Sequence, residues 1–299
     1  MKIAVIFGGS GFVGKSVIRK LLKQKFRIKV ITRDKEKSAA LKTFAAPDFL
    51  SLIEWNYQNY NKLDSFISGA DLVVNLVGIL AEEKNGDFIK IHTDLAKIIA
   101  EKCQEFNVKN LVHLSALGVE KPSKAKYAAS KMEAEKQVLA SFSNVTILRP
   151  SIIFGANDNF FNKFAKMAKQ KRILPLINNG MTKFQPIYVE DLGEIIAKIP
   201  QTKKAIGKIY EIGGDKIYSF QSLMKLVENY CNCRVLFINL PFFAANILAF
   251  FLEFFTKKII TRDQVKMLKI DSVLSENNFK TDFAINPKSI EEIVPNYLR

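Results

Sequence analysis

The sequence has few cysteines, and their positions do not favour a structural role. Cys103, Cys231 and Cys233 are too few for a disulfide framework, and the Cys231–Cys233 pair lacks the partners that a zinc site needs. The sequence also lacks a targeting segment, because the apolar run 3–7 stops at two glycines. We therefore expect a cytoplasmic protein with reduced thiols and no metal. With 14 glycines and 9 prolines, its composition excludes collagen-like and disordered chains.

Acidic residues are scarce relative to basic ones. The chain carries 45 Lys and Arg against 29 Asp and Glu, which gives a formal net charge of +16. Such a surface attracts phosphate, nucleic acid or acidic lipid, although the lysine excess also has a purely compositional explanation. No nucleic-acid partner is expected, because the sequence shows no interleaving of aromatic and basic residues typical of an RNA-binding module.

The first half of the chain alternates strand-like and helical patterns. The strand-like runs are 3–7, 28–32, 71–80, 110–118 and 144–150. Strands separated by helices predict an α/β fold with a Rossmann-type, doubly wound parallel sheet. We assign residues 1–155 to a dinucleotide-binding domain. Residues 156–299 are predicted to form a smaller, mainly helical C-terminal cap domain, interleaved with late segments of the sheet. Its helical patterns cover 159–170, 191–199, 219–230 and 242–255.

The most informative local motif is GGSGFVG, at residues 8–14. Gly8, Gly11 and Gly14 come directly after a predicted strand and before a predicted helix. In that position they permit a tight turn, close approach of a pyrophosphate, and close packing of the helix on the sheet. The N–H groups at the start of the helix then face the phosphates. This motif predicts a bound nicotinamide dinucleotide.

The end of the second predicted strand bears on the choice of nucleotide. A site selective for NAD places an acidic residue there to bind the ribose 2′-hydroxyl. Here the strand ends at Thr32, and the next residue, Arg33, suits a 2′-phosphate. Asp34 is the rival, but Lys35 and Lys37 surround it with positive charge. NADP(H) is therefore favoured over NAD(H).

These motifs, together with the sequence Tyr127-Ala-Ala-Ser-Lys131, resemble the extended short-chain dehydrogenase/reductase superfamily. Further blocks resemble one atypical branch, which contains the alpha-subcomplex subunit 9 of respiratory complex I and its bacterial relatives. The blocks are VNLVGIL (74–80), HLSALGVE (113–120), YAASKMEAE (127–135), LRPSIIFGANDNFF (148–161), FQPIYVEDLG (184–193), LPFFAANILAFFLEFF (240–255) and TRDQVKMLKID (261–271). The likeness extends over nearly the whole chain.

The resemblance implies where a dinucleotide binds. Asn56 falls where the superfamily has an Asp that contacts the adenine amine. Residues 76–78 correspond to the adenine-ribose side, and residues 150–152 to the nicotinamide end. The expected cofactor-binding residues are Gly8, Ser10, Gly11, Phe12, Val13, Gly14, Arg33, Asn56, Leu76, Val77, Gly78, Tyr127, Lys131, Pro150, Ser151 and Ile152.

Tyr127 and Lys131 are the expected catalytic pair, because residues four apart lie on one face of a helix. The lysine ammonium is expected to favour the phenolate, and the tyrosine to exchange the proton that accompanies hydride transfer. Ser115 stands where the superfamily has a residue that orients the substrate. It is followed by Ala116 instead of completing a Ser-Ser pair, so it either replaces the expected residue or only ends its strand. His92 and His113 are interpreted as structural.

Two aspartates are interpreted as helix caps. Asp158, together with Asn159, is expected to cap the helix over 160–170, and Asp191 to cap a helix that begins near Leu192.

Residues 242–255 are the most apolar stretch, yet at 14 residues they are too short to span a bilayer. They form either a core helix or a peripheral contact, because phenylalanine occurs on every side of the helix. Basic residues follow directly and suit anionic headgroups. These are Lys257, Lys258, Arg262 and Lys266.

Two functions follow from these observations. The first is an NADP(H)-binding accessory or assembly component of complex I, held at the cytoplasmic face of the inner membrane through residues 242–269. The alternative is an NAD(P)-dependent oxidoreductase or epimerase acting on a nucleotide sugar, with Tyr127 as acid/base and Lys131 as its partner. The sequence leaves open whether the protein turns over a substrate.

Overall fold

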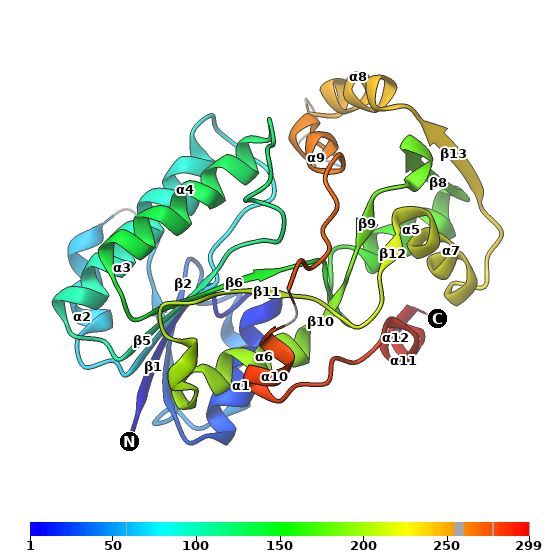
Figure 1. The fold of residues 1–299 in the computed structure, drawn as a ribbon. Helices are drawn as coiled ribbons and strands as arrows, with labels where there is room; N and C mark the ends of the chain where they lie inside the picture. Colours follow the sequence, from blue (N-terminus) through cyan, green and yellow to red (C-terminus); the bar gives the residue numbers. More distant parts are fainter. Residues whose placement is uncertain (58, 254–259, 277, 299) are drawn as a thin grey trace.

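The centre of the molecule is a seven-stranded parallel sheet. The structure is a computed structural model that describes residues 1–57, 59–253, 260–276 and 278–298. The strand order is β11-β6-β5-β4-β1-β2-β3, and every neighbouring pair is parallel (Figure 1). The α/β prediction is therefore confirmed. The strands are β1 (Ile3–Phe7), β2 (Arg27–Thr32), β3 (Leu50–Glu54), β4 (Leu72–Asn75), β5 (Asn110–Leu114), β6 (Val145–Pro150) and β11 (Ile209–Ile212).

Helices cover both faces of the sheet, as a parallel sheet requires. On one face lie α1 (Phe12–Lys23) and α6 (Val189–Lys198), and on the other lie α2 (Leu63–Ile67), α3 (Leu95–Glu105) and α4 (Lys126–Ser141). A short π-helix, η3 (Ile89–Asp94), leads into α3. The 3-10 helices are η1 (Ala39–Phe44), η2 (Tyr60–Lys62), η4 (Asn178–Gly180), η5 (Ile199–Gln201) and η6 (Lys203–Ala205).

Close packing between α1 and α6 depends on small residues. A Cβ atom on Gly193 of α6 would lie 2.2 Å from Ser16 Oγ of α1, so only glycine fits at this crossing. Val17, Ile18 and Leu21 of α1 are spaced to face the sheet, and all three are fully buried. The start of α1, with its glycine loop, is thereby held firmly against the sheet.

The remaining elements form a group beyond the carboxyl ends of the sheet strands (Figure 1). Its core contains Phe154, Phe161, Phe220 and Leu223. Its strands pair as β7 (Ile153–Phe154) with β10 (Ile187–Tyr188), β8 (Ile173–Ile177) with β13 (Leu236–Leu240), and β9 (Lys183–Phe184) with β12 (Tyr218–Ser219). Its helices are α5 (Phe161–Lys171), α7 (Phe220–Tyr230), α8 (Phe242–Leu252), α9 (Arg262–Met267), α11 (Ile290–Ile293) and α12 (Pro295–Leu298).

Several segments of the second half return to the sheet. β11 pairs with β6, α6 packs against α1, and α10 (Asn278–Phe283) lies beside β11. We propose that residues 1–155 and 156–299 are two folding units, the second of which returns segments to the sheet of the first.

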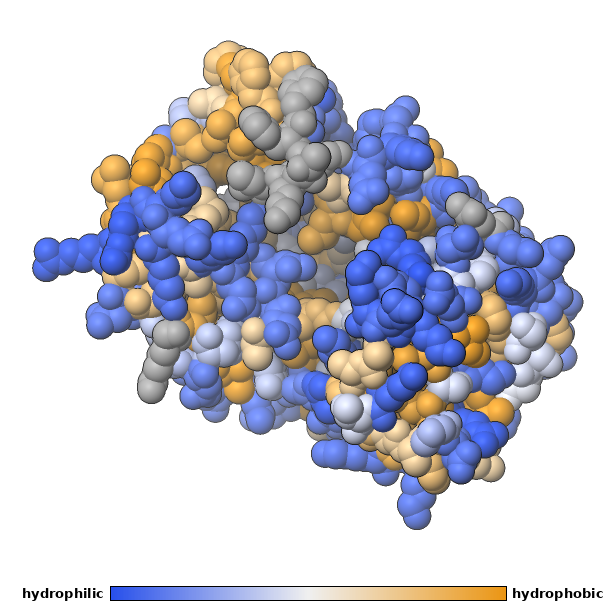
Figure 2. Space-filling model, turned by 180° about the vertical axis from the view of Figure 1, so that it is seen from behind, coloured by the Kyte–Doolittle hydropathy of each residue, from blue (hydrophilic) through white to orange (hydrophobic). Residues whose placement is uncertain are grey.

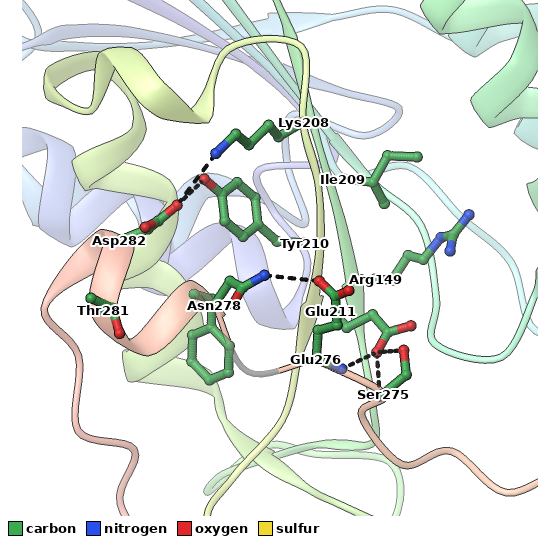
Figure 3. A pocket seen from close by; sticks show the side chains of 11 residues that line it. Arg149, Lys208, Ile209, Tyr210, Glu211, Ser275, Glu276, Asn278, Thr281 and Asp282 are labelled. Carbon is green, nitrogen blue, oxygen red and sulfur yellow. Dashed lines mark hydrogen bonds and ion pairs between the residues drawn. The ribbon is translucent and has the colours of Figure 1, made fainter.

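Polar contacts fasten the C-terminal segment to β11, around a cavity of about 530 Å³ (Figure 3). The hydroxyl of Tyr210 donates to Asp282 at 2.7 Å, and Glu211 Oε2 accepts from the N–H and hydroxyl of Ser275. Lys208 also pairs with Asp282, at 3.8 Å. Because these side chains satisfy one another, we interpret the cavity as part of the architecture.

A buried ion pair joins β6 to α4. The guanidinium of Arg149 donates to both carboxylate oxygens of Glu135, with an Nη2–Oε2 distance of 2.6 Å. Glu135 is only 1% exposed. Glu120 lies 3.3 Å from the same guanidinium. The helix that carries Tyr127 and Lys131 is thus tied electrostatically to the sheet.

The two expected helix caps have different outcomes. Asp158 Oδ1 accepts from the N–H groups of Phe160 and Asn162, as a cap does. The prediction for Asp191 is wrong, because α6 already begins at Val189 and Asp191 lies in its first turn. Its carboxylate instead accepts from the N–H of Lys288 at 2.7 Å, which fixes the C-terminal segment.

Helix α8 is not a core helix. Of its residues Phe242–Leu252, only Ala245 and Ala249 are buried, whereas Phe243 is 77% exposed. Lys257, Lys258 and the end of the apolar run lie outside the described residues. Among the residues that are described, no helix is both long enough and apolar enough to cross a membrane.

Candidate functional site

The site begins where the strand order changes direction. β1 and β4 are neighbours in the sheet, while the chain continues from β1 to β2 on one side and from β4 to β5 on the other. In open α/β sheets, ligands bind outside the carboxyl ends of the strands at this point. Phe7, the last residue of β1, pairs with both Ile31 and Asn75. The glycine loop after β1 therefore lies between the loops that follow β2 and β4.

The glycine loop forms a cradle that larger residues would fill. Gly8 has φ +76°, and a Cβ there would lie 3.2 Å from the backbone of Leu76 and Val77. A Cβ on Gly14 would lie 2.4 Å from the carbonyl oxygen of Gly9. Gly11 is the N-cap of α1, whose first turn carries no acidic residue and no side-chain cap. The open N–H groups of this turn suit a phosphate, so the loop fits a dinucleotide.

The adenosine end of the expected site lies at β2 and β3. Ser10 Oγ is 3.3 Å from Thr32 Oγ1, which connects the glycine loop to the end of β2. Asp34 is occupied by Lys37, whose backbone N–H and ammonium both lie 2.9 Å from its carboxylate and keep its pKa below the usual value. Arg33 is exposed. Burial raises the pKa of Tyr57, the neighbour of Asn56, and the positive charge of Arg33 opposes this rise.

A cavity of about 790 Å³ extends from the carboxyl edge of the sheet into the cap. Ten of the expected site residues line it, and the structure brings these together: Phe12, Val13, Leu76, Gly78, Ser115, Tyr127, Lys131, Pro150, Ser151 and Ile152. The other seven do not line this cavity: Gly8, Ser10, Gly11, Gly14, Arg33, Asn56 and Val77.

Tyr127 is buried in the first turn of α4. Its ring packs edge-on against His92, with ring centroids 5.3 Å apart, and against Phe88 at 5.9 Å. Burial raises the pKa of Tyr127 to about 12. The cost of burying the anion thus opposes the lysine-favoured phenolate that the sequence predicts. Tyr127 holds its proton at neutral pH, so it is suited to donating a hydrogen bond or a proton to a ligand oxygen.

Lys131 lies one turn further along α4. Its Nζ donates to the carbonyl oxygen of Leu114, at the end of β5, over 3.0 Å. Burial lowers the pKa of Lys131 to about 8, although the charge of Glu135 opposes this shift. A Cβ on Gly78 would lie 3.4 Å from this Nζ. The glycine therefore leaves room between the β4 loop and the lysine.

Ser115 directly follows β5. Its backbone N–H donates to Leu148 at 2.8 Å, which fixes its position at the end of the sheet. The side chain is only 5% exposed, and within the described part of the chain its Oγ has no hydrogen-bond partner. A buried hydroxyl without a partner is costly, and this one lines the cavity. It is thus available to a ligand.

Ser151 and the histidines have structural contacts. Ser151 Oγ is bonded to the carbonyl oxygen of Ser272 at 2.8 Å and is therefore already engaged. His92 Nε2 accepts from the N–H of Ile79 at 3.0 Å and thereby holds the β4 loop. Burial and the charge of Lys131 lower the pKa of His92 and of His113 to about 3, so both are neutral.

One site residue was not predicted from the sequence. Asp263, in α9 of the cap, accepts from the backbone N–H groups of Lys126 and Tyr127, at 2.7 and 2.9 Å. It therefore caps α4 from 136 positions away along the chain. The sequence signal was one of two acidic residues in the 261–271 block, and nothing local connects it with Tyr127.

This geometry can be compared with known proteins. A family model described as the NAD dependent epimerase/dehydratase family matches residues 4–213. The chain belongs to this family. Hydride transfer is the chemistry that a nicotinamide dinucleotide supplies when it is bound in such a fold. The residues of this chain would hold it at the glycine loop and at Gly78, next to the Tyr127 proton.

Relatives refine the position of the chain within the family. It is 27% identical to NADH dehydrogenase [ubiquinone] 1 alpha subcomplex subunit 9, mitochondrial, from Arabidopsis thaliana, over 93% of this chain and 72% of that protein. The rat protein of the same name is 28% identical, over 97% of this chain and 78% of its own length. The predicted resemblance to this branch is confirmed.

Solved structures support the fold alone. The NADPH-dependent quinone oxidoreductase from Escherichia coli, complexed with NADPH, has a TM-score of 0.77 at 17% identity and covers 99% of each chain. The dTDP-glucose 4,6-dehydratase from Bacillus anthracis, in complex with NAD, has a TM-score of 0.76 at 16% identity, over all of this chain and 96% of that one. This family fold binds nicotinamide dinucleotides.

Proposed function

We propose that this chain is an NADP(H)-binding accessory or assembly component of respiratory complex I (NADH:ubiquinone oxidoreductase), held peripherally at the cytoplasmic face of the membrane. Two observations support the proposal. The relatives from plant and rat are named as subunits of NADH dehydrogenase. In addition, α8 presents an apolar surface to the outside of the protein.

The exposed face of α8 is the observation that carries this proposal. Phe243, Ile247 and Phe251 are each more than two-fifths exposed on a helix that packs through its alanines. Figure 2 shows the apolar side chains gathered over this part of the cap, at the upper left. Arg262 stacks on the ring of Phe250 at 5.0 Å, and Lys269 on that of Phe242 at 5.1 Å. An apolar face rimmed by cations suits a membrane-bound partner with anionic lipid around it.

The double variant Phe243→Ser/Phe251→Ser is expected to lose the complex I partner. Each serine removes a large exposed apolar side chain without changing the core. The test is affinity purification of the tagged full chain from solubilised membranes, with complex I subunits quantified by mass spectrometry. We expect their recovery to fall about tenfold or more. Ile217→Ser is the matched control, because Ile217 is also exposed but lies away from α8. Recovery of no complex I subunits with the wild-type chain would overturn the proposal.

NADP(H) preference is expected to depend on Arg33. The neighbouring acid is paired with Lys37, which leaves the arginine to meet a 2′-phosphate. We expect the wild-type protein to bind NADPH more tightly than NADH. Arg33→Ser should weaken NADPH binding by about 10- to 100-fold and leave NADH binding nearly unchanged, since a charge-assisted hydrogen bond is lost. Calorimetric titration measures both affinities, with Lys35→Ser as control. Tighter binding of NADH by the wild type would contradict the assignment.

A second candidate function is an NAD(P)-dependent oxidoreductase or epimerase. It is favoured by the protonated Tyr127 and the unpartnered Ser115 hydroxyl, which line one cavity. Tyr127 would be the acid/base of this reaction, and Lys131 its partner. A nucleotide sugar is the substrate predicted from the sequence. The lining of the cavity in the cap instead favours a different class of substrate.

A further inference from the structure

The cavity changes character where it leaves the sheet and enters the cap. Beyond the expected cofactor residues its walls come from α5, α8 and α9, through Phe164, Met167, Leu248, Leu252 and Met267. Helix α5 is far in the sequence from α8 and α9, and together the three helices present hydrocarbon and thioether surface to one space. Such a lining favours a ligand that is apolar over most of its length.

Few polar side chains interrupt this lining. Among the described residues of α5, α8 and α9 that line the cavity, Lys163 and Gln264 are the polar ones. A sugar carries a hydroxyl on nearly every carbon, and each would exchange bonds with water for apolar contacts, at a substantial free-energy cost. Among the described residues that line the cavity there is no carboxylate, and the side-chain amides are those of Asn159 and Gln264. The cap end of the cavity is thus unsuited to a sugar.

Two polar groups that can bind a ligand oxygen line the sheet end of the same cavity. Ser115 Oγ is buried and without a partner among the described residues, and Tyr127 is protonated in the same wall. Two hydroxyls at the sheet edge suit one ligand oxygen, whereas the rest of the space suits hydrocarbon.

We infer that the cavity binds an elongated lipid, with one carbonyl or hydroxyl oxygen at Ser115 and Tyr127 and its hydrocarbon chain between α5 and the α8–α9 pair. The inference deepens the proposed function: it rests on the dinucleotide site only for the placing of the oxygen. The chain-binding part stands on the cap residues alone.

The mouth of the cavity lies beside the apolar outer face of α8. Leu248 lines the cavity and is also 44% exposed, so it borders both the interior and the surface. Phe243 and Phe251 do not line the cavity but lie on the same helix and face outward. The same helix therefore offers one side to a bilayer and another to the ligand. A lipid would pass from the bilayer into the cavity along α8 with little of its hydrocarbon chain exposed to water.

The test is calorimetric titration of the full chain, saturated with NADPH, with 2-pentanone, 2-nonanone and 2-tridecanone. These ketones share one polar end and differ only in chain length. We expect affinity to rise by about two- to fourfold per methylene, hence by at least about 100-fold from the shortest to the longest. UDP-glucose should bind more weakly than 2-tridecanone. Affinity independent of chain length, or tighter binding of UDP-glucose, would overturn the inference.

Variants locate the binding. Met167→Glu should weaken 2-tridecanone binding at least about tenfold and leave NADPH affinity unchanged, because it places a carboxylate in the apolar wall. Gln170→Glu makes the same change in charge on the exposed side of α5 and should leave ketone binding unchanged. Equal effects of the two variants would contradict the inference. Leu248→Glu repeats the test at the half-exposed mouth if Met167→Glu does not fold.

The two ends of the site can be separated in the same experiment. Tyr127→Phe should weaken all three ketones by a similar factor of about tenfold, because only the oxygen contact is lost. Chain-length dependence without NADPH binding would remove the proposed function and leave the lipid site standing. NADPH binding and complex I recovery without chain-length dependence would do the reverse.

Discussion

Gly14→Ala is expected to lower the affinity for NADPH by about 100-fold or more. A Cβ at this position would lie 2.4 Å from Gly9 O and 2.5 Å from Gly9 C and Cα, so it meets backbone, which does not yield as a flexible side chain does. Gly9 cannot move away from the new methyl group, because it is itself tightly packed: a Cβ added to Gly9 would lie 2.9 Å from a methyl of Val30. The start of α1 must therefore move away from the loop, and its N–H groups leave the phosphate position.

Titration with NADPH, alongside thermal unfolding, separates this effect from a loss of stability. Gly69→Ala is the control, since a Cβ on Gly69, in the turn before β4, would lie in open space. That variant should lose some stability from its φ of +74° and keep its NADPH affinity. A folded Gly14→Ala protein that binds NADPH within threefold of the wild type would contradict the assignment of the loop.

Arg149→Met is expected to lower the free energy of unfolding by about 3–5 kcal/mol. The substitution leaves Glu135 buried without the guanidinium that donates to both of its oxygens. Glu120 also loses its neighbour, at 3.3 Å. The penalty arises mainly from the carboxylate that remains, and not from the attraction that is lost. Because Glu135 belongs to α4, the loss should also loosen the helix that carries Tyr127.

Urea unfolding at pH 7 measures this change. Lys97→Met is the control, because Lys97 forms an exposed pair with Glu101 at 3.8 Å and its loss should leave stability nearly unchanged. The double variant Arg149→Met/Glu135→Leu should recover much of the loss, since no buried charge then remains. If the double variant were as unstable as Arg149→Met alone, packing and not the orphaned charge would be the cause.

Local patterns were sufficient to predict much of the sheet and the glycine loop. Strands such as β1 and β6 are short apolar runs whose residues are nearly all buried, so periodicity identifies them. The run 71–80 was longer than its strand, because β4 ends at Asn75 and the remaining residues form the loop over the site. An apolar run cannot by itself distinguish a buried strand from a partly exposed loop that lines a cavity.

Other features depend on contacts between distant segments. Composition left α8 open between core and surface, because its phenylalanines occur on every side; only packing shows that two alanines face inward. The raised pKa of Tyr127 comes from the burial of its side chain, which no spacing reveals. The bond from Ser151 to Ser272 likewise joins residues 121 positions apart. These long-range contacts determine the chemistry of the site more than its motifs do.

The capping of α4 by Asp263 has a consequence for the coupling of the two halves. Asp263 belongs to α9, which packs against α8, and its carboxylate holds the backbone N–H of Tyr127 itself. Any displacement of α9 that accompanies docking of α8 thus acts on the position of the tyrosine hydroxyl. By thermodynamic reciprocity, a ligand that orders Tyr127 must favour one setting of the outer helix to the same extent. Binding of a ligand in the cavity and docking of α8 on a partner are then coupled, so that each changes the affinity of the other by the same factor.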